Sequence, residues 1–145
     1  MSIPAILAPV FVQVLLTFCL LFWMGHVRFA AVRAGEVRDR EGALLGRPVW
    51  PARPTQAANA FGNQFELPVL FYALVAFALF TRKADLLFVV LAWVFVATRI
   101  VHALVYVGPN VLRYRFGAFL AGALVLLAMW AIFALRILLA QAEPA

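Results

Sequence analysis

Polar and ionisable side chains interrupt two otherwise hydrophobic segments of this chain, at spacings that put them on single helical faces. Gln56, Asn59, Asn63 and Glu66 stand at i, i+3, i+7 and i+10. At 100° per residue these positions fall within about 80° of one another on a helix, so they form one polar stripe. A carboxylate in such a stripe accepts hydrogen bonds from an ammonium group, which suits a small zwitterionic ligand.

A second stripe is formed by Arg99, His102 and Tyr106, which stand at i, i+3 and i+7 and fall within about 60° of one another. Arginine binds carboxylates through its charge and its two-pronged geometry, so this stripe suits an anionic group. Taken alone, His102 also fits a satisfied core histidine, and Tyr106 fits an aromatic residue of the membrane interface.

Both stripes must lie inside a membrane, because the hydrophobic runs beside them are too short to cross one alone. Leu67–Phe80 has 14 residues and Leu86–Thr98 has 13, whereas a spanning helix needs about 20 residues. Ionisable groups at membrane depth are costly, so they face protein or water and mark functional sites by default. Glu66 is expected about 15 Å and Arg99 about 12 Å from the same membrane surface. We therefore expect both stripes to face one polar cavity.

Arg113 and Arg115 follow the second stripe and are expected at the mouth of this cavity. The alternative is that Glu66 and Arg99 form only a structural ion pair, with the asparagines as hydrogen-bonding links between helices. The stripes together contain more polar groups than such a pair needs, which favours a ligand-binding site.

The composition is that of an integral membrane protein. The 145 residues are 67% hydrophobic and 12% charged, with a mean hydropathy of +1.02, whereas soluble domains are about 45–50% apolar. The 12 basic residues are scattered around hydrophobic segments and form no basic groove, which argues against nucleic acid as a partner. The single cysteine, Cys19, excludes a disulfide framework and a membrane dithiol oxidoreductase.

Hydropathy and turn signals predict one all-α domain over residues 1–145, a bundle of four transmembrane helices. The spans are expected at about 3–27, 57–80, 85–107 and 112–138, and the first helix can continue past Arg28 as an amphipathic extension. The polar segment 28–55 contains three prolines near its end, which favour a loop before the second span. The expected N-caps of the second, third and fourth helices are Thr55, Asp85 and Asn110.

Basic residues are distributed unequally between the two sides of this predicted bundle. The loop 28–55 and the start of the fourth span carry eight Lys and Arg residues, and the opposite side carries three. Because cytoplasmic loops are enriched in basic residues, we expect the long first loop to be cytoplasmic and both chain termini to lie outside.

The two stripes resemble motifs of the MAPEG family, the membrane-associated proteins of eicosanoid and glutathione metabolism. The stretch 99–108, which holds Arg99, His102 and Tyr106, is similar to the corresponding stretch of the microsomal prostaglandin E synthase branch. Asn63 and Glu66 are similar to the Asn and Glu of the family's second-helix motif. The family has an Arg four residues before that Asn, where this chain has Asn59.

The resemblance covers essentially the whole chain and implies a homotrimer with glutathione bound between subunits, as substrate or cofactor, and no metal. The residues that would bind glutathione are Asn63, Glu66, Arg99, His102, Tyr106 and Arg113. Arg115 and Arg28 would stabilise the thiolate, because a nearby guanidinium favours the charged form of the thiol. The second substrate would be an apolar electrophile or a lipid peroxide that enters from the bilayer.

Three functions remain open at the level of the sequence. The first is a glutathione-dependent transferase or peroxidase. The second is a non-catalytic or differently liganded relative that binds another thiol or a lipid, for which Asn59 is the main support. The third is a small proton-coupled transporter that uses Glu66. The crowding of the polar groups on one side of the membrane argues against a carrier, whose charge must be accessible from both sides.

Overall fold

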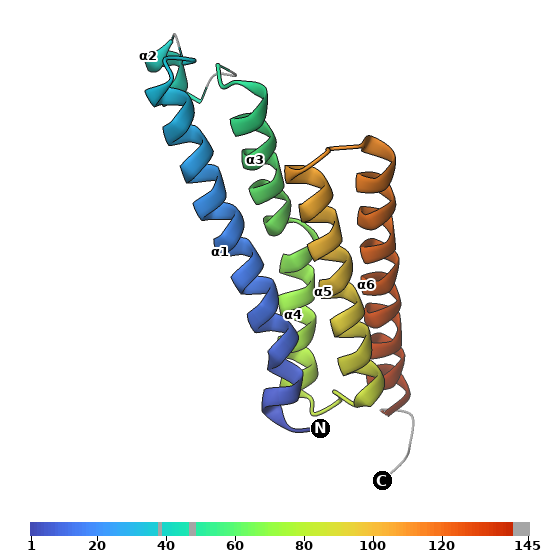
Figure 1. Ribbon diagram of the computed structural model, residues 1–145. Coiled ribbons are helices and arrows are strands. Elements are labelled where there is room, and N and C mark those ends of the chain that lie inside the picture. Colours follow the sequence, from blue (N-terminus) through green and yellow to red (C-terminus); the bar gives the residue numbers. More distant parts are fainter. Residues whose placement is uncertain (38, 47–48, 141–145) are drawn as a thin grey trace.

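The chain is helical along most of the part that the computed structural model describes, which comprises residues 1–37, 39–46 and 49–140. Its long helices run side by side, and α6 finishes at the end of the bundle where α1 begins (Figure 1). The elements in chain order are α1 (Ile3–Arg33), α2 (Arg40–Leu44), α3 (Ala52–Gly62), η1 (Asn63–Phe65), α4 (Leu67–Phe80), α5 (Leu86–Val107) and α6 (Leu112–Ala140).

Four helical segments are long and apolar enough to cross a membrane, which confirms the predicted all-α architecture with four spans. They are Ile3–Arg33, Ala52–Phe80, Leu86–Val107 and Leu112–Leu139. Many large apolar side chains on these segments are exposed, among them Phe22 at 72% and Leu15 at 62%. Such an apolar outer surface is stable in a lipid bilayer, because the hydrocarbon chains are as apolar as these side chains.

The first helix does continue past Arg28, and the second span begins earlier than the expected residue 57. α1 continues to Arg33, and Gly35, at φ 72°, takes the left-handed conformation that favours glycine after a helix. α3 begins at Ala52, so Pro54 lies in its first turn, where a missing N–H removes no helical hydrogen bond. The predicted loop 28–55 is correspondingly shorter, and its residues 38 and 47–48 lie outside the described part.

The predicted N-caps have different outcomes. Asp85 does cap α5, since its Oδ1 accepts a hydrogen bond from the backbone N–H of Phe88 at 2.9 Å. Thr55 lies inside α3, so its assignment as a cap was wrong. Asn110 was also wrongly assigned: its φ is 49°, and its side chain accepts a hydrogen bond from the guanidinium of Arg115.

The second span is not the continuous helix that the sequence predicted, because the helix breaks at Glu66. α3 gives way to the 3-10 turn η1, and Glu66 then has φ −97° and ψ −107° before α4 begins. The cause is Pro68, which has no N–H to donate to the carbonyl four residues earlier and whose ring clashes with that carbonyl. The rotation of 100° per residue, by which side chains were assigned to one helical face, therefore does not apply beyond Phe65.

The core of the bundle lies between α4, α5 and α6, where Phe71 of α4 stacks on Phe95 of α5 with ring centroids 4.7 Å apart. Farther along α5, Gly122 of α6 allows close approach, because a Cβ at this position would lie 2.7 Å from the Oγ1 of Thr98. Of the small residues on α6, Gly122 is buried whereas Gly117 is exposed. Gly122 is thus the one that brings α6 against α5 beside the second stripe.

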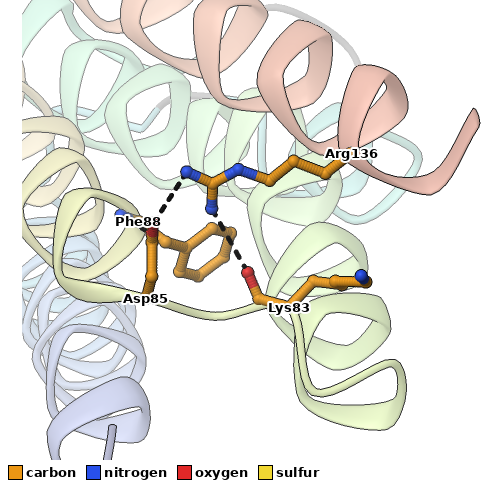
Figure 2. Close-up of polar contacts among 4 residues, drawn as sticks. All are labelled: Lys83, Asp85, Phe88 and Arg136. Atoms are coloured by element: carbon orange, nitrogen blue, oxygen red, sulfur yellow. Dashed lines mark hydrogen bonds and ion pairs between the residues drawn. The ribbon is translucent and has the colours of Figure 1, made fainter. Parts of the chain in front are cut away.

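An ion pair joins the far end of α6 to the turn between α4 and α5 (Figure 2). The Nη2 of Arg136 lies 2.7 Å from the Oδ2 of Asp85, and its Nη1 donates to the carbonyl of Lys83 at 3.5 Å. The guanidinium holds the pKa of the Asp85 carboxyl below its ordinary value, and the hydrogen bond from Phe88 acts in the same direction. This contact closes the bundle at the end opposite to the polar stripes.

Candidate functional site

Arg99 is the most deeply buried charged group of the described residues, with 0% of its surface exposed. Its Nη2 donates to the backbone carbonyl of Asn63 at 3.2 Å, and its guanidinium lies 5.8 Å from the ring centre of Phe119. Its Nε and Nη1 have no hydrogen-bond partner within the described chain. A buried guanidinium with unused donors is costly, and it is complementary to an anionic ligand.

The break in the second span explains why Arg99 bonds to a backbone carbonyl. Where a helical ladder is interrupted, carbonyls near the break lose their regular donors and become open to side chains. Asn63 opens η1 directly before the break, and its own side chain donates to the carbonyl of Asn59 at 3.1 Å. The contact places Arg99 of the second stripe against the backbone of Asn63, a residue of the first stripe.

The side chain of Glu66 is exposed, and the described residues show no ion pair between it and Arg99 within 4 Å. The direct pairing considered from the sequence is therefore absent within one chain. The backbone at Glu66 is irregular, with φ −97° and ψ −107°, so regular helical spacing does not fix the direction of this side chain. An exposed carboxylate at membrane depth still needs protein or water beside it.

A pocket of about 180 Å³ lies between the end of α5 and the start of α6. Its lining brings together four predicted site residues with three apolar ones, namely Asn63, His102, Tyr106, Arg115, Leu112, Phe116 and Phe119. The polar groups lie on three elements, η1, α5 and α6, so the pocket exists only because the bundle packs these elements together.

His102, which lines this pocket, has a buried acceptor without a hydrogen-bond partner among the described residues. Its Nδ1 lies 3.0 Å from the carbonyl of Arg115, and since a carbonyl only accepts, Nδ1 carries the proton. In the neutral ring Nε2 is then an acceptor, and it is buried without a partner among the described residues. Tyr106 and Phe119 hold the ring from two sides, with centroid distances of 5.6 and 5.8 Å. An N–H or S–H donor of a ligand would satisfy Nε2.

Arg115 is held at the same pocket by two side-chain contacts. Its Nη1 donates to the Oδ1 of Asn110 at 2.7 Å, and its guanidinium lies 4.3 Å from the ring centre of Tyr106. A cation stacked on an aromatic face and fixed by an amide is oriented before any ligand arrives. Arg115 thus supplies the positive charge of the pocket from the first turn of α6.

Gln56, Arg113 and Arg28 lie elsewhere. The side chain of Gln56 donates to the carbonyl of Tyr106 and, at 3.3 Å, to that of Gly108, so it joins α3 to the end of α5. Arg113 is exposed. Arg28 lies over Trp50, with its guanidinium 4.9 Å from the ring centre, and it does not line the pocket of Arg115.

Sequence reasoning missed a buried amide pair. Gln13 of α1 donates through Nε2 to the Oε1 of Gln64 at 2.8 Å, and Gln64 donates to the carbonyl of Ala60 at 3.2 Å. Both glutamines are buried, at 0% and 1% exposure. The signal was present, because Gln13 is a lone amide within an apolar run and such groups seek partners on neighbouring helices. Gln64 belongs to η1, so α1 is tied directly to the break.

Among the residues that the structure describes, no group of three or more His, Cys, Asp or Glu side chains is placed to hold a metal ion. A comparison with protein families matched residues 6–135 to the one described as the MAPEG family. Comparisons with curated proteins and with solved structures gave no match. The family match reaches into all four spans and does not resolve a branch within the family.

Proposed function

The chain belongs to the MAPEG family, and we propose that it is a membrane-embedded glutathione-dependent transferase or peroxidase. Its second substrate is an apolar electrophile or a lipid peroxide that reaches the site from the bilayer. The resemblance of the two stripes to family motifs supports glutathione as the thiol. The unequal distribution of basic residues supports a cytoplasmic loop between α1 and α3, with both termini outside.

The observation that carries this proposal is the state of Arg99. A guanidinium that is wholly buried, with two unpartnered nitrogens and one bond to a backbone carbonyl, is complementary to a carboxylate, which accepts two parallel N–H bonds. Glutathione carries two carboxylates, one ammonium group and a thiol. Arg99 and the exposed Arg113 bind the carboxylates, and Glu66 binds the ammonium.

Arg99 does not line the Arg115 pocket, whereas four other predicted site residues do. These four act on the middle of the ligand and on its sulfur. Asn63 and the Nε2 of His102 bond to peptide groups, and Tyr106 forms the wall. Arg115 favours the thiolate over the thiol, since lowering a thiol pKa by two units needs about 2.7 kcal/mol of differential stabilisation. Arg28 is the second candidate for this role, although within one chain it lies over Trp50 and does not line the pocket.

Two reactions follow from a bound thiolate. In the transferase reaction the sulfur forms a bond to an electrophilic carbon, and the leaving group departs with the electrons of the broken bond and takes up a proton. In the peroxidase reaction the sulfur attacks one peroxide oxygen, the O–O bond breaks, and an alcohol leaves. A second glutathione then converts the resulting glutathione sulfenic acid to the disulfide and water.

The homotrimer is supported by what one chain leaves exposed. Glu66 and the wide side of the Arg115 pocket are open on the single chain, although a charged side chain at this depth is not stable against lipid. A neighbouring subunit that covers this face both removes the carboxylate from lipid and closes the binding site.

The decisive experiment is titration calorimetry of glutathione into the purified protein in detergent, with Arg99→Ala, Arg99→Lys and the control Arg33→Ala. Arg33 is exposed near the end of α1, so its loss removes the same charge away from the pocket. We expect saturable binding by the wild type and by Arg33→Ala, and at least about tenfold weaker binding by both Arg99 variants.

Folding of the variants is checked by their thermal melts and gel-filtration profiles, and Arg99→Lys keeps a buried cation in case Arg99→Ala does not fold. A folded wild type that binds no glutathione would contradict the proposal. The second reading, another thiol or a lipid in the same pocket, would then take its place, with Asn59 as the reason for the lost affinity. Proton-coupled uptake into vesicles, abolished by Glu66→Gln, would instead point to a transporter.

A further inference from the structure

A second polar pocket, of about 210 Å³, lies between the last turns of α1 and the first turn of α3. Both elements reach the end of the bundle where α2 is placed (Figure 1). Ala30, Ala31 and Ala34 supply the space, because their short side chains leave the α1 face shallow, and Arg53 faces them from α3. This pocket shares no lining residue with the pocket of Arg115.

The pocket lies at the level of a membrane interface. Trp23 follows Ile3, the first residue of α1, by a rise of about 30 Å, the thickness of the hydrocarbon core. Tryptophan is enriched at this level, where its ring meets both lipid chains and headgroups. The guanidinium of Arg53 lies 5.3 Å from the ring centre of Trp23, which orients it at the headgroup layer.

The charged groups of the pocket are of opposite sign and are not paired with each other. Arg53 and His26 can donate to an anion, and Glu36 can accept from a cation. Neither the carboxylate of Glu36 nor the guanidinium of Arg53 has an ion-pair partner among the described side chains. A ligand with a phosphate and an ammonium group a short distance apart matches this arrangement.

We propose that this pocket binds the headgroup of an aminophospholipid of the phosphatidylethanolamine type. Arg53 and His26 bind the phosphate, and Glu36 accepts hydrogen bonds from the primary ammonium group. The acyl chains run down the exposed aromatic side of α1, past Phe22. A choline headgroup cannot donate to Glu36, and a glycerol headgroup carries no cation, so the pocket distinguishes between these headgroups. The site is separate from the proposed thiol site.

Native mass spectrometry of the purified protein tests this directly, with equal amounts of phosphatidylethanolamine, phosphatidylcholine and phosphatidylglycerol of the same acyl chains added to the detergent. We expect about tenfold preferential retention of phosphatidylethanolamine, the effect of one charge-assisted hydrogen bond. Glu36→Gln should lose the preference over phosphatidylcholine, and Arg53→Ala should reduce retention of all three lipids. Arg33→Ala removes an equal charge near the end of α1. It should change neither the preference for phosphatidylethanolamine nor the retention of the three lipids.

Equal retention of the three lipids by the wild type would overturn the proposal, and so would a preference that survives Glu36→Gln. Complete displacement by an equal concentration of soluble glycerophosphoethanolamine would also overturn it, since the lipid chains would then contribute nothing. Glutathione calorimetry on Glu36→Gln separates this site from the thiol site. Unchanged glutathione binding is expected, whereas its loss would assign Glu36 to the thiol site and contradict the lipid assignment.

Discussion

At the level of single residues, the contact between α5 and α6 depends on Gly122. Gly122 of α6 lies opposite Thr98 and Arg99 of α5, and a Cβ on Gly122 would lie at an ordinary contact distance, 3.7 Å, from the Cδ of Arg99. The same Cβ would come within 2.7 Å of the Oγ1 of Thr98. A close contact between α5 and α6 therefore lies beside the residue that carries the buried cation.

Replacing Gly122 by alanine should destabilise the protein by about 1–3 kcal/mol, because the added methyl group overpacks this contact. Gly117→Ala on the same helix is the matched control, since a Cβ there meets nothing within 4 Å. Thermal melts in detergent should show a lower melting temperature for Gly122→Ala alone.

The clash is attributed to one hydroxyl, which allows a second check. In a Thr98→Ala background, Gly122→Ala should cost less than in the wild type, and the difference measures the coupling between the two positions. An equal cost in both backgrounds would show that Thr98 is not what limits the approach of α6.

At the level of elements, the broken second span depends on α1 for its support. Gln13 reaches from α1 to Gln64 in η1, next to the carbonyl that Arg99 uses. The break therefore has a buried polar partner on each side, from α1 and from α5. The orientation of Asn63 within the site follows from these two contacts.

Gln13→Leu should lower stability by about 1 kcal/mol, the order found for hydrogen bonds between membrane helices. The loss arises because Gln64 keeps a buried acceptor without a donor. The double variant with Gln64→Leu should recover part of the lost stability, since both polar ends are then gone, and the melting temperatures of the three variants measure this. If the double variant loses more stability than the two single variants lose together, Gln13 and Gln64 do not act as a simple hydrogen-bonded pair.

The ion pair at the turn between α4 and α5 makes the stability of the fold depend on pH. The pKa of Asp85 is lowered by its ion pair with Arg136 and by its bond from Phe88, so its charged form stabilises the fold. For a lowered pKa this stabilisation is present above the ordinary value of 3.8 and is lost as the pH falls through the folded-state value. Because the Asp85 side chain is 48% exposed, the effect is modest.

Asp85→Asn keeps an oxygen to cap α5 and removes the charge. We expect the wild type to melt at a higher temperature than Asp85→Asn at about pH 7, and the gap to narrow towards about pH 3. Arg136→Gln serves as the partner control and should flatten the same pH dependence. A gap that is constant over this range would mean that the ion pair does not contribute to stability.

For the whole molecule, the exposed Glu66 indicates that one chain is not the complete unit. If the proposed trimer is right, light scattering corrected for detergent should give a protein mass of three times 16.1 kDa. A monodisperse monomer that is folded and binds glutathione would refute a site shared between subunits, because one chain would then be sufficient. If the trimer is weak, added glutathione should raise the fraction of the protein that is trimeric, since a ligand stabilises the form that binds it.

The amino-acid sequence by itself determined the four spans, the presence of two polar stripes and the cap at Asp85. Each depends on local properties, namely hydropathy over about 20 residues, helical spacing, and a side chain beside its own helix end. Only the tertiary structure decided which groups meet. Arg99 bonds to the carbonyl of Asn63 and Gln13 bonds to Gln64, over separations of 36 and 51 residues. Such pairs depend on how each helix is rotated against its neighbour, and the break at Glu66 changes that rotation midway through a span.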